Sequence, residues 1–186
     1  MDADTSVFHA CVPLARGTTS LLPLDDLAAV DPAAAQDALA KYDDTAERRR
    51  LRDTVIPVLD RRWTAVIFLS PVHPHAIWRA WREIRGRERP DLLFWAIPSV
   101  DLPGGSVVLD RSSTATGDPI DPTEVTPFDR YAHRASTTTT PANRAWLEQC
   151  ARQGVSGAWF HGIPHVLAPG PVPLDRARVI SWRDPA

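Results

Sequence analysis

The pattern of apolar and polar positions changes several times along the chain, and each change predicts a different element. Residues 6–12 are rich in β-branched and aromatic side chains, which predicts a short first strand that carries His9. The apolar run at residues 63–69 stops at Ser70 and Pro71 and predicts a buried central strand. Further strands are expected at residues 92–97, 106–109, 158–160 and 178–182.

Helices are expected where apolar residues recur at spacings of three and four. The clearest segment is 76–85, whose apolar stripe consists of Ile77, Ala80, Trp81 and Ile84. A second helix is expected to begin at Pro141 and to end at Gly154.

Two helices are expected earlier in the chain. Asp31 followed by Pro32 is typical of a helix start, so residues 33–42 are predicted to be helical. The pattern restarts at residue 43 and runs through residue 52. Residues 55–59 are expected to supply the apolar face of this helix, with Pro57 ending or kinking it.

Residues 111–140 differ from the rest of the chain because they are rich in Ser, Thr, Asp and Pro and lack a periodic apolar pattern. A stretch of this length inside a domain predicts a long loop or a lid. Elsewhere, helices and strands are interspersed without strict alternation, and neither a repeat nor a linker divides them. One α+β domain over residues 1–186 is therefore expected.

The composition is consistent with one domain and indicates which partners and which cellular compartment are expected. The chain has 186 residues, of which 44% are hydrophobic, enough for a full core. Its formal net charge of -2 gives no electrostatic case for nucleic acid or an anionic membrane. Two distant cysteines, an acidic start unlike a signal peptide, and no apolar run near the roughly 18 residues of a membrane span predict a reduced, cytoplasmic, soluble protein.

Arginine-rich stretches at residues 48–52 and 79–89 raise nucleic acid as a partner, because the second contains Trp81 and follows Trp78. Cationic and aromatic side chains together can bind phosphates and stack on bases. With a negative net charge, solvated helix faces with buried tryptophans explain the pattern better. Nucleic acid is therefore not the favoured partner.

Four of the six histidines form two close pairs, His73 with His75 and His161 with His165. On extended segments, the two members of each pair would point to the same side, so one metal ion could contact all four. No carboxylate or cysteine accompanies them, and packing in loops explains them more simply. A histidine-dependent enzyme of secondary metabolism, using a metal ion or acid–base catalysis, stays an alternative, as does a non-enzymatic partner-binding protein.

Common nucleophile and nucleotide motifs are absent from the sequence. There is no Gly-x-Ser-x-Gly pattern and no glycine-rich phosphate loop that leads into a helix. Serine hydrolases, kinases and Rossmann-type enzymes are therefore not favoured.

Three stretches, taken in order, resemble the strands of the ADP-ribosyltransferase superfamily. That family has an early His or Arg, a middle strand with Tyr or Ser, and a late Glu. Residues 7–10, with His9, resemble the first strand, and residues 65–70 resemble the second. Residues 163–174 are similar to the closing segment of the DNA-modifying members. The resemblance implies two small mixed or antiparallel sheets that form a cleft flanked by helices.

The resemblance also implies roles for individual residues. His9 would hydrogen-bond the adenosine-side ribose of NAD, Phe68 would stack near the nicotinamide, and Ser70 would help to fix it. The late residue would hold the nicotinamide ribose and stabilise the oxocarbenium-like transition state. Here His165 occupies the place of the family's Glu.

This replacement matters because positive charge develops at the sugar carbon in the transition state. A carboxylate stabilises that charge, whereas a neutral imidazole can only hydrogen-bond a hydroxyl and a protonated one opposes the charge. Three outcomes are open: an atypical or repurposed transferase or glycohydrolase, an enzyme whose carboxylate comes from elsewhere, or a domain that binds NAD or another nucleotide-like ligand without chemistry. Glu148 and Asp175 are the carboxylates nearest in sequence.

Overall fold

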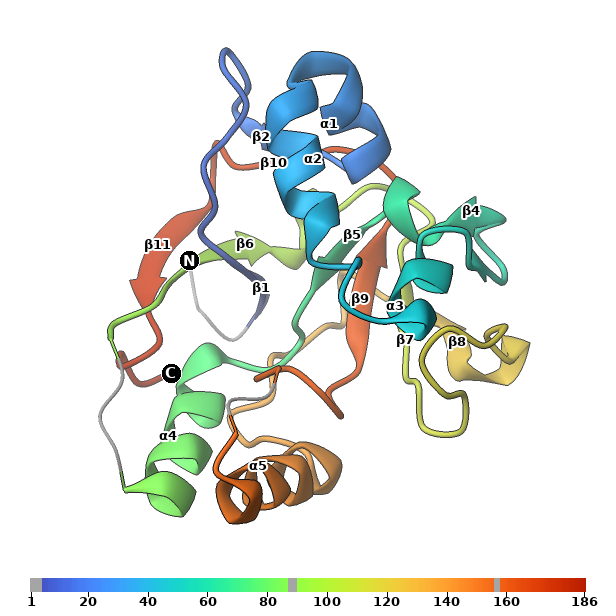
Figure 1. Ribbon diagram of the computed structural model, residues 1–186. Helices are drawn as coiled ribbons and strands as arrows, with labels where there is room; N and C mark the ends of the chain where they lie inside the picture. Colours follow the sequence, from blue (N-terminus) through green and yellow to red (C-terminus); the bar gives the residue numbers. More distant parts are fainter. Residues whose placement is uncertain (1–4, 87–89, 156–157) are drawn as a thin grey trace.

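The computed structural model describes residues 5–86, 90–155 and 158–186, and these form an α+β fold. Figure 1 shows α1 and α2 at one end of the molecule, α4 and α5 at the opposite end, and small sheets between them. Within the described residues, no helix is long and apolar enough to cross a membrane. The helices are α1 (Leu24–Val30), α2 (Pro32–Ala40), α3 (Ala46–Leu51), α4 (Pro74–Arg85) and α5 (Pro141–Gln153).

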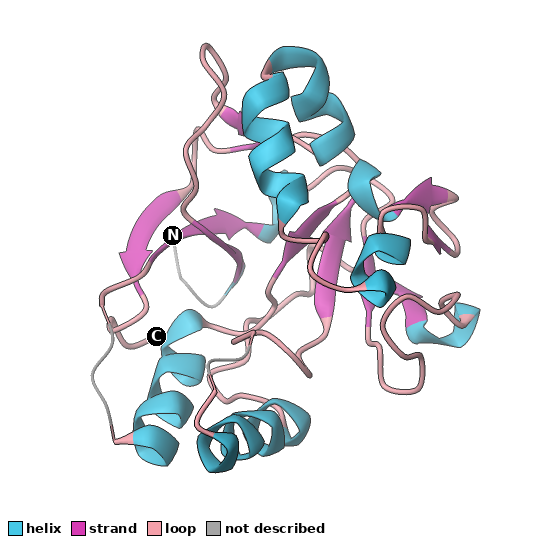
Figure 2. Ribbon diagram, in the orientation of Figure 1, coloured by secondary structure: helices cyan, strands magenta, loops and turns pink. Residues whose placement is uncertain are grey.

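Two antiparallel sheets form the centre of the fold (Figure 2). The first has the order β1-β6-β11 and consists of β1 (Ser6–Ala10), β6 (Leu93–Pro98) and β11 (Arg178–Ser181). The second has the order β5-β9-β7-β8 and consists of β5 (Ile67–Leu69), β9 (His165–Ala168), β7 (Val107–Leu109) and β8 (Val125–Pro127). Two short pairs complete the set: β2 (Ser20–Leu21) with β10 (Val172–Pro173), and β3 (Val55–Ile56) with β4 (Arg61–Arg62).

The two larger sheets meet at one point, where β1 passes the end of β5. Phe8 and Ser70 exchange both backbone hydrogen bonds there, at 2.9 and 2.8 Å. Beyond this bridge, β1 pairs with β6 and β5 pairs with β9, so the described strands β1 and β5 make no further ladder with each other. In the described part of the chain, the two sheets are therefore joined only at Phe8 and Ser70 and diverge from there. We call the space between the diverging strands β1 and β5 the fork.

Both faces of the four-stranded sheet are buried, each in its own apolar cluster. One cluster includes Ile67, Leu69 and Val166, and the other includes Leu109 and Leu167. This division follows from the alternation of side chains along a strand. Burial of each large apolar side chain stabilises the fold by about 1.5–3 kcal/mol. These two clusters therefore hold the four-stranded sheet in place.

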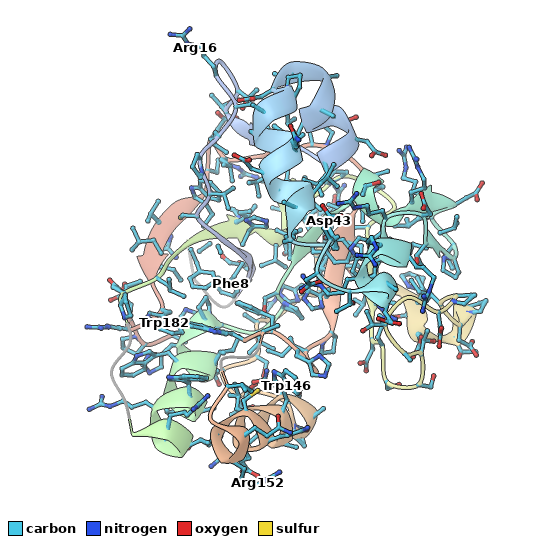
Figure 3. The ribbon with its side chains drawn as sticks, viewed as in Figure 1. Phe8, Arg16, Asp43, Trp146, Arg152 and Trp182 are labelled. Carbon is cyan, nitrogen blue, oxygen red and sulfur yellow. The ribbon has the colours of Figure 1, made fainter. Side chains whose placement is uncertain are left out.

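A column of three tryptophans connects the three-stranded sheet to α4. Trp182, directly after β11, stacks on Trp159 with ring centroids 4.5 Å apart, and Trp159 stacks on Trp81 of α4 at 5.6 Å. Figure 3 shows Trp182 between the sheet and α4, below Phe8. Phe8 and Phe94 belong to the same buried cluster as Trp182. The column therefore holds α4 against the sheet that carries His9.

Local sequence signals predicted several elements correctly. The strands expected at 6–12, 92–97, 106–109 and 178–182 are present as β1, β6, β7 and β11. Asp31 caps α2, since its Oδ1 accepts a hydrogen bond of 3.0 Å from the backbone of Ala34. Gly154 ends α5 with a φ of 69°. These signals depend on contacts between residues a few positions apart, so they can be read from the sequence without knowledge of the tertiary structure.

The prediction that residues 55–59 extend a helix was wrong. Helix α3 ends at Leu51, and Val55–Ile56 pairs with Arg61–Arg62 as the hairpin β3-β4. Val58 and Asp60 have φ values of 71° and 49° in the turn of this hairpin. Pro57 cannot continue a helix, and the chain reverses in this turn instead.

Two expected strands also differ. Residues 63–65 form a 3-10 turn, and only Ile67–Leu69 is a strand, which lies at the edge of its sheet and not at the centre. Residues 158–160 contain turns, and Trp159 and Phe160 pack against two apolar clusters. Both stretches are apolar because neighbouring elements cover them. A covered turn and a buried strand have the same apolar composition, so the sequence pattern does not distinguish them.

Residues 111–140, expected as a long loop or lid, contain strand β8 and a 3-10 turn at Pro122–Glu124. The carboxylate of Glu124 is buried and accepts hydrogen bonds from the backbone and hydroxyl of Ser113 and the backbone of Thr114, at 2.7–2.9 Å. Burial alone would raise the pKa of Glu124, but the bonds from Thr114 and Ser113 lower it to about 2. Strand β8 pairs with β7, which attaches this part of the segment to the sheet. The ionised carboxylate of Glu124 holds the chain at Ser113 and Thr114 against it.

Candidate functional site

A cavity of about 570 Å³ lies in the fork between β1 and β5, against the helical pair α1-α2. Most of its wall is apolar and comes from the chain after β1, from α1 and from β5. Representative apolar residues are Val12, Leu14, Leu21, Leu27, Ala38 and Ile67. The polar and aromatic residues that matter for chemistry are His9, Asp37, Lys41, Tyr42, Trp63 and Phe68.

An aromatic wall forms one side of the cavity. The rings of Trp63 and Phe68 are in contact, with centroids 4.3 Å apart. Trp63 Nε1 donates a hydrogen bond of 3.1 Å to the hydroxyl of Tyr42, which fixes the indole in place. Stacking of a planar ring on such a surface contributes about 1–3 kcal/mol to binding. The two rings are therefore held in place at the cavity wall, and the Arg111 guanidinium lies 5.6 Å from the centroid of the Trp63 ring.

His9 lines the cavity, and its contact with Ala10 indicates which ring nitrogen carries the proton. Its Nδ1 lies 2.7 Å from the carbonyl oxygen of Ala10, and because a carbonyl can only accept, Nδ1 carries the proton. Burial lowers the pKa of His9, with a smaller opposing effect from the bond to Ala10, so the neutral ring is favoured near pH 7. Nε2 is then an unprotonated acceptor. A ligand hydroxyl or N–H group can donate to it.

His165 begins β9 and lies edge-on to Phe68, with ring centroids 5.9 Å apart. Burial lowers the pKa of His165 to about 4, and a hydrogen bond to the backbone of Ile163 offsets only part of this effect. The ring is therefore neutral at pH 7. A neutral imidazole neither supplies the negative charge of a carboxylate nor opposes a developing cation, and His165 is not among the residues that line the cavity.

The lowered pKa of His165 predicts acid-dependent stability. The unfolded chain binds a proton near pH 6.5 and the folded chain only near pH 4, so stability falls as the pH drops between these values. We expect the drop in the free energy of unfolding from pH 7 to pH 5 to be about 2 kcal/mol smaller in His165→Asn than in the native chain. Urea denaturation at the two pH values measures this difference. Equal drops in both proteins would show that His165 does not titrate in this way.

Ser70 does not line the cavity. Its buried hydroxyl donates to the carbonyl of Val72 at 2.9 Å and accepts from the backbone N–H of Val72 at 3.1 Å. These bonds shape the turn between β5 and α4. Of the residues that the family resemblance assigns to NAD, His9 and Phe68 line the cavity, whereas Ser70 and His165 do not.

The four-histidine metal site does not form. His73 caps α4, with its Nδ1 accepting from the backbone of His75 at 3.2 Å, and His161 packs on Trp146 at 4.4 Å. Over the described residues, no three His, Cys, Asp or Glu side chains come together as a metal-binding group. The prediction assumed extended segments, but α4 starts at Pro74 and places His75 in its first turn.

A hydrogen-bonded turn fixes the chain that leads into β9. Asn143 is fully buried and donates to the carbonyl oxygens of Trp159 and His161, both at 2.8 Å. Gly162 has a φ of 76°, and a Cβ atom there would lie 2.8 Å from the backbone nitrogen of Asn143. Only glycine fits this close approach. The start of α5 therefore sets the position from which His165 enters the sheet.

The replacement carboxylates expected from the sequence are not at the cavity. Glu148 lies on α5, 3.6 Å from Arg144, and neither Glu148 nor Asp175 lines the cavity. The carboxylate among the lining residues is Asp37 of α2. Sequence reasoning missed it, together with its neighbour Lys41, whose status as the single lysine of the chain was the available signal.

Comparisons of the chain with protein-family models, with curated proteins and with solved structures give no match.

Proposed function

We propose that this chain binds NAD or a closely related nucleotide-like ligand in the cavity between β1 and β5, on a fold of the ADP-ribosyltransferase type in which two small sheets form the cleft. The observation that carries the proposal is that His9 and Phe68, distant in sequence, line one cavity. Its volume of about 570 Å³ falls within the roughly 300–1,000 Å³ typical of small-molecule sites.

The lining residues suggest how such a ligand would be oriented. His9 Nε2 would accept a hydrogen bond from a ribose hydroxyl, and Phe68 with Trp63 would stack on a planar ring. His165 packs edge-on against Phe68 and is not among the residues that line the cavity, so its role would be to hold the Phe68 ring in place. These are neutral contacts that recognise shape and hydroxyl groups.

The cavity is not expected to promote rapid release of nicotinamide from NAD. The oxocarbenium-like transition state of that reaction needs negative charge beside the sugar, and His165 is neutral. Asp37 lies on α2, on the helical side of the cavity. Any transfer or hydrolysis of NAD would therefore be slow relative to an enzyme that has the late carboxylate.

Loss of the His9 acceptor is expected to weaken binding. We predict that NAD and ADP-ribose raise the melting temperature of the native chain and that His9→Ala binds each about tenfold more weakly, which corresponds to one neutral hydrogen bond. Calorimetric titration measures the affinities. His75→Ala is the control, because His75 lies on α4, outside the cavity, and should leave affinity unchanged. Equal effects of the two substitutions would count against a site at His9.

A further inference from the structure

The helical side of the cavity carries a cation without a counterion. Lys41 follows α2, is the single lysine of the chain and lines the cavity. Its Nζ lies 5.1 Å from the centroid of the Tyr42 ring. In the described chain, no carboxylate forms an ion pair with it, and Asp37, one helical turn earlier, does not either. Such a cation is available to an anionic group of a ligand.

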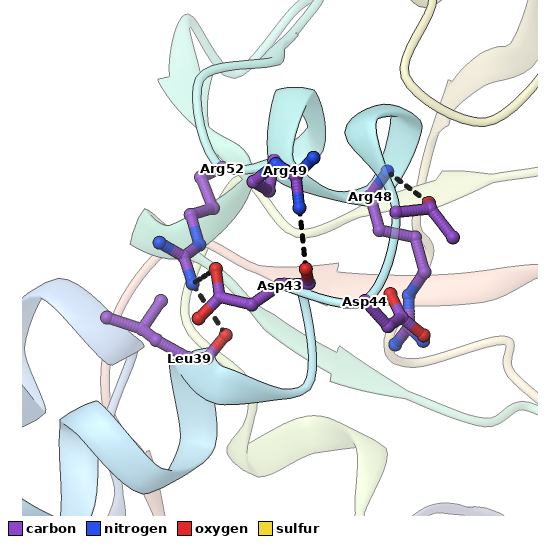
Figure 4. A network of polar contacts seen from close by, with 7 residues as sticks. Leu39, Asp43, Asp44, Arg48, Arg49 and Arg52 are labelled. Carbon is purple, nitrogen blue, oxygen red and sulfur yellow. Dashed lines mark hydrogen bonds and ion pairs between the residues drawn. The ribbon is translucent and has the colours of Figure 1, made fainter.

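The neighbouring residues Arg49 and Arg52 differ from Lys41 because their guanidinium groups bond to other groups of the protein (Figure 4). Arg52 forms an ion pair of 2.6 Å with Asp43 and donates to the carbonyl oxygen of Leu39 at 2.8 Å. Arg49 donates to the backbone oxygen of Asp43 at 2.6 Å. This network joins the end of α2 to α3 and fixes the turn that contains Lys41.

One arginine adds positive charge beside Lys41. The guanidinium of Arg48 lies 5.9 Å from the centroid of the same Tyr42 ring and forms an ion pair of 2.5 Å with Asp44. Burial and then the charge of Arg48 lower the pKa of Lys41. Arg48 is paired with Asp44 and does not line the cavity, so Lys41 is the cation that a ligand in the cavity can reach. Lys41 therefore gives this end of the cavity a positive charge that an anionic group can pair with, one helical turn from the carboxylate of Asp37.

We propose that Lys41 binds the phosphate or pyrophosphate group of the ligand, so that the anionic group lies at the end of α2 and the planar ring lies against Phe68 and Trp63. This inference rests on the proposed function and deepens it by assigning the end of the cavity that recognises phosphate. Ammonium–phosphate hydrogen bonds are among the stronger polar contacts in proteins, so this end would contribute much of the affinity. Asp37 has the opposite effect and repels the anion.

The single lysine allows a direct chemical test. Lys41 is acetylated with an amine-reactive ester, and the rate is followed by mass spectrometry of its one peptide, with ADP-ribose, adenosine or inorganic pyrophosphate present. We expect saturating ADP-ribose and pyrophosphate to slow acetylation at least about fivefold, and adenosine to slow it less than about twofold. An unchanged rate while calorimetry shows ADP-ribose bound would overturn the inference, as would equal protection by adenosine.

The same experiment separates this inference from the proposed function. Protection by pyrophosphate, with no binding of NAD, ADP-ribose or adenosine, would support the anion site and overturn the nucleotide ligand. Absence of binding by every probe would overturn both.

Substitutions give an independent test with opposite signs. Lys41→Met should weaken ADP-ribose binding about tenfold, Lys41→Arg should restore most of it, and Asp37→Asn should bind at least as tightly as the native chain. Arg79→Gln is the control, since Arg79 lies on α4 and pairs with Glu83. Unchanged affinity in Lys41→Met would overturn the inference.

Discussion

Replacing Trp182 with alanine is expected to reduce the free energy of unfolding by about 3–5 kcal/mol. The side chain is 1% exposed, stacks on Trp159 at 4.5 Å and belongs to the cluster that contains Phe8 and Phe94. Its removal would leave a cavity between the three-stranded sheet and α4, which the rigid strands around it cannot fill. Urea denaturation at pH 7 measures the loss.

Replacing Trp182 with phenylalanine should cost far less, about 1 kcal/mol. The indole Nε1 is buried and has no hydrogen-bond partner among the described residues, so its removal relieves an unsatisfied donor. That gain offsets part of the lost apolar contact. If the two substitutions destabilised the protein equally, the indole nitrogen would have to be satisfied in solution, and this description of the tryptophan column would be wrong.

The sequence predicted those elements whose signals are local. Asp31 with Pro32 and the glycine at 154 mark helix ends through bonds that span three or four residues. Helix α1 was missed because it has only seven residues (Leu24–Val30), too few for an apolar stripe to recur over several turns. The hairpin at residues 55–62 was missed because its short apolar run fits a helix or a strand equally well.

The candidate site was predictable only where a family pattern pointed to it. His9 and Phe68 were expected at one site and line one cavity, whereas the metal-binding arrangement of four histidines was wrong. The fork itself depends on the contact of Phe8 with Ser70, which no local pattern encodes. Lys41 and Tyr42 reach the cavity because α2 packs against the fork, so only tertiary structure shows their role.

The central claim, that the cavity between β1 and β5 is the ligand site, is tested most directly by filling it. Ala38 lines the cavity from α2, whereas Ala33 lies exposed on the same helix, outside the cavity. We predict by calorimetric titration that NAD and ADP-ribose bind the native chain and Ala33→Trp with equal affinity and that Ala38→Trp loses at least about a hundredfold in affinity while remaining folded, because an indole occupies much of the space a ligand needs. Undiminished binding in folded Ala38→Trp, or no binding to the native chain, would contradict the account.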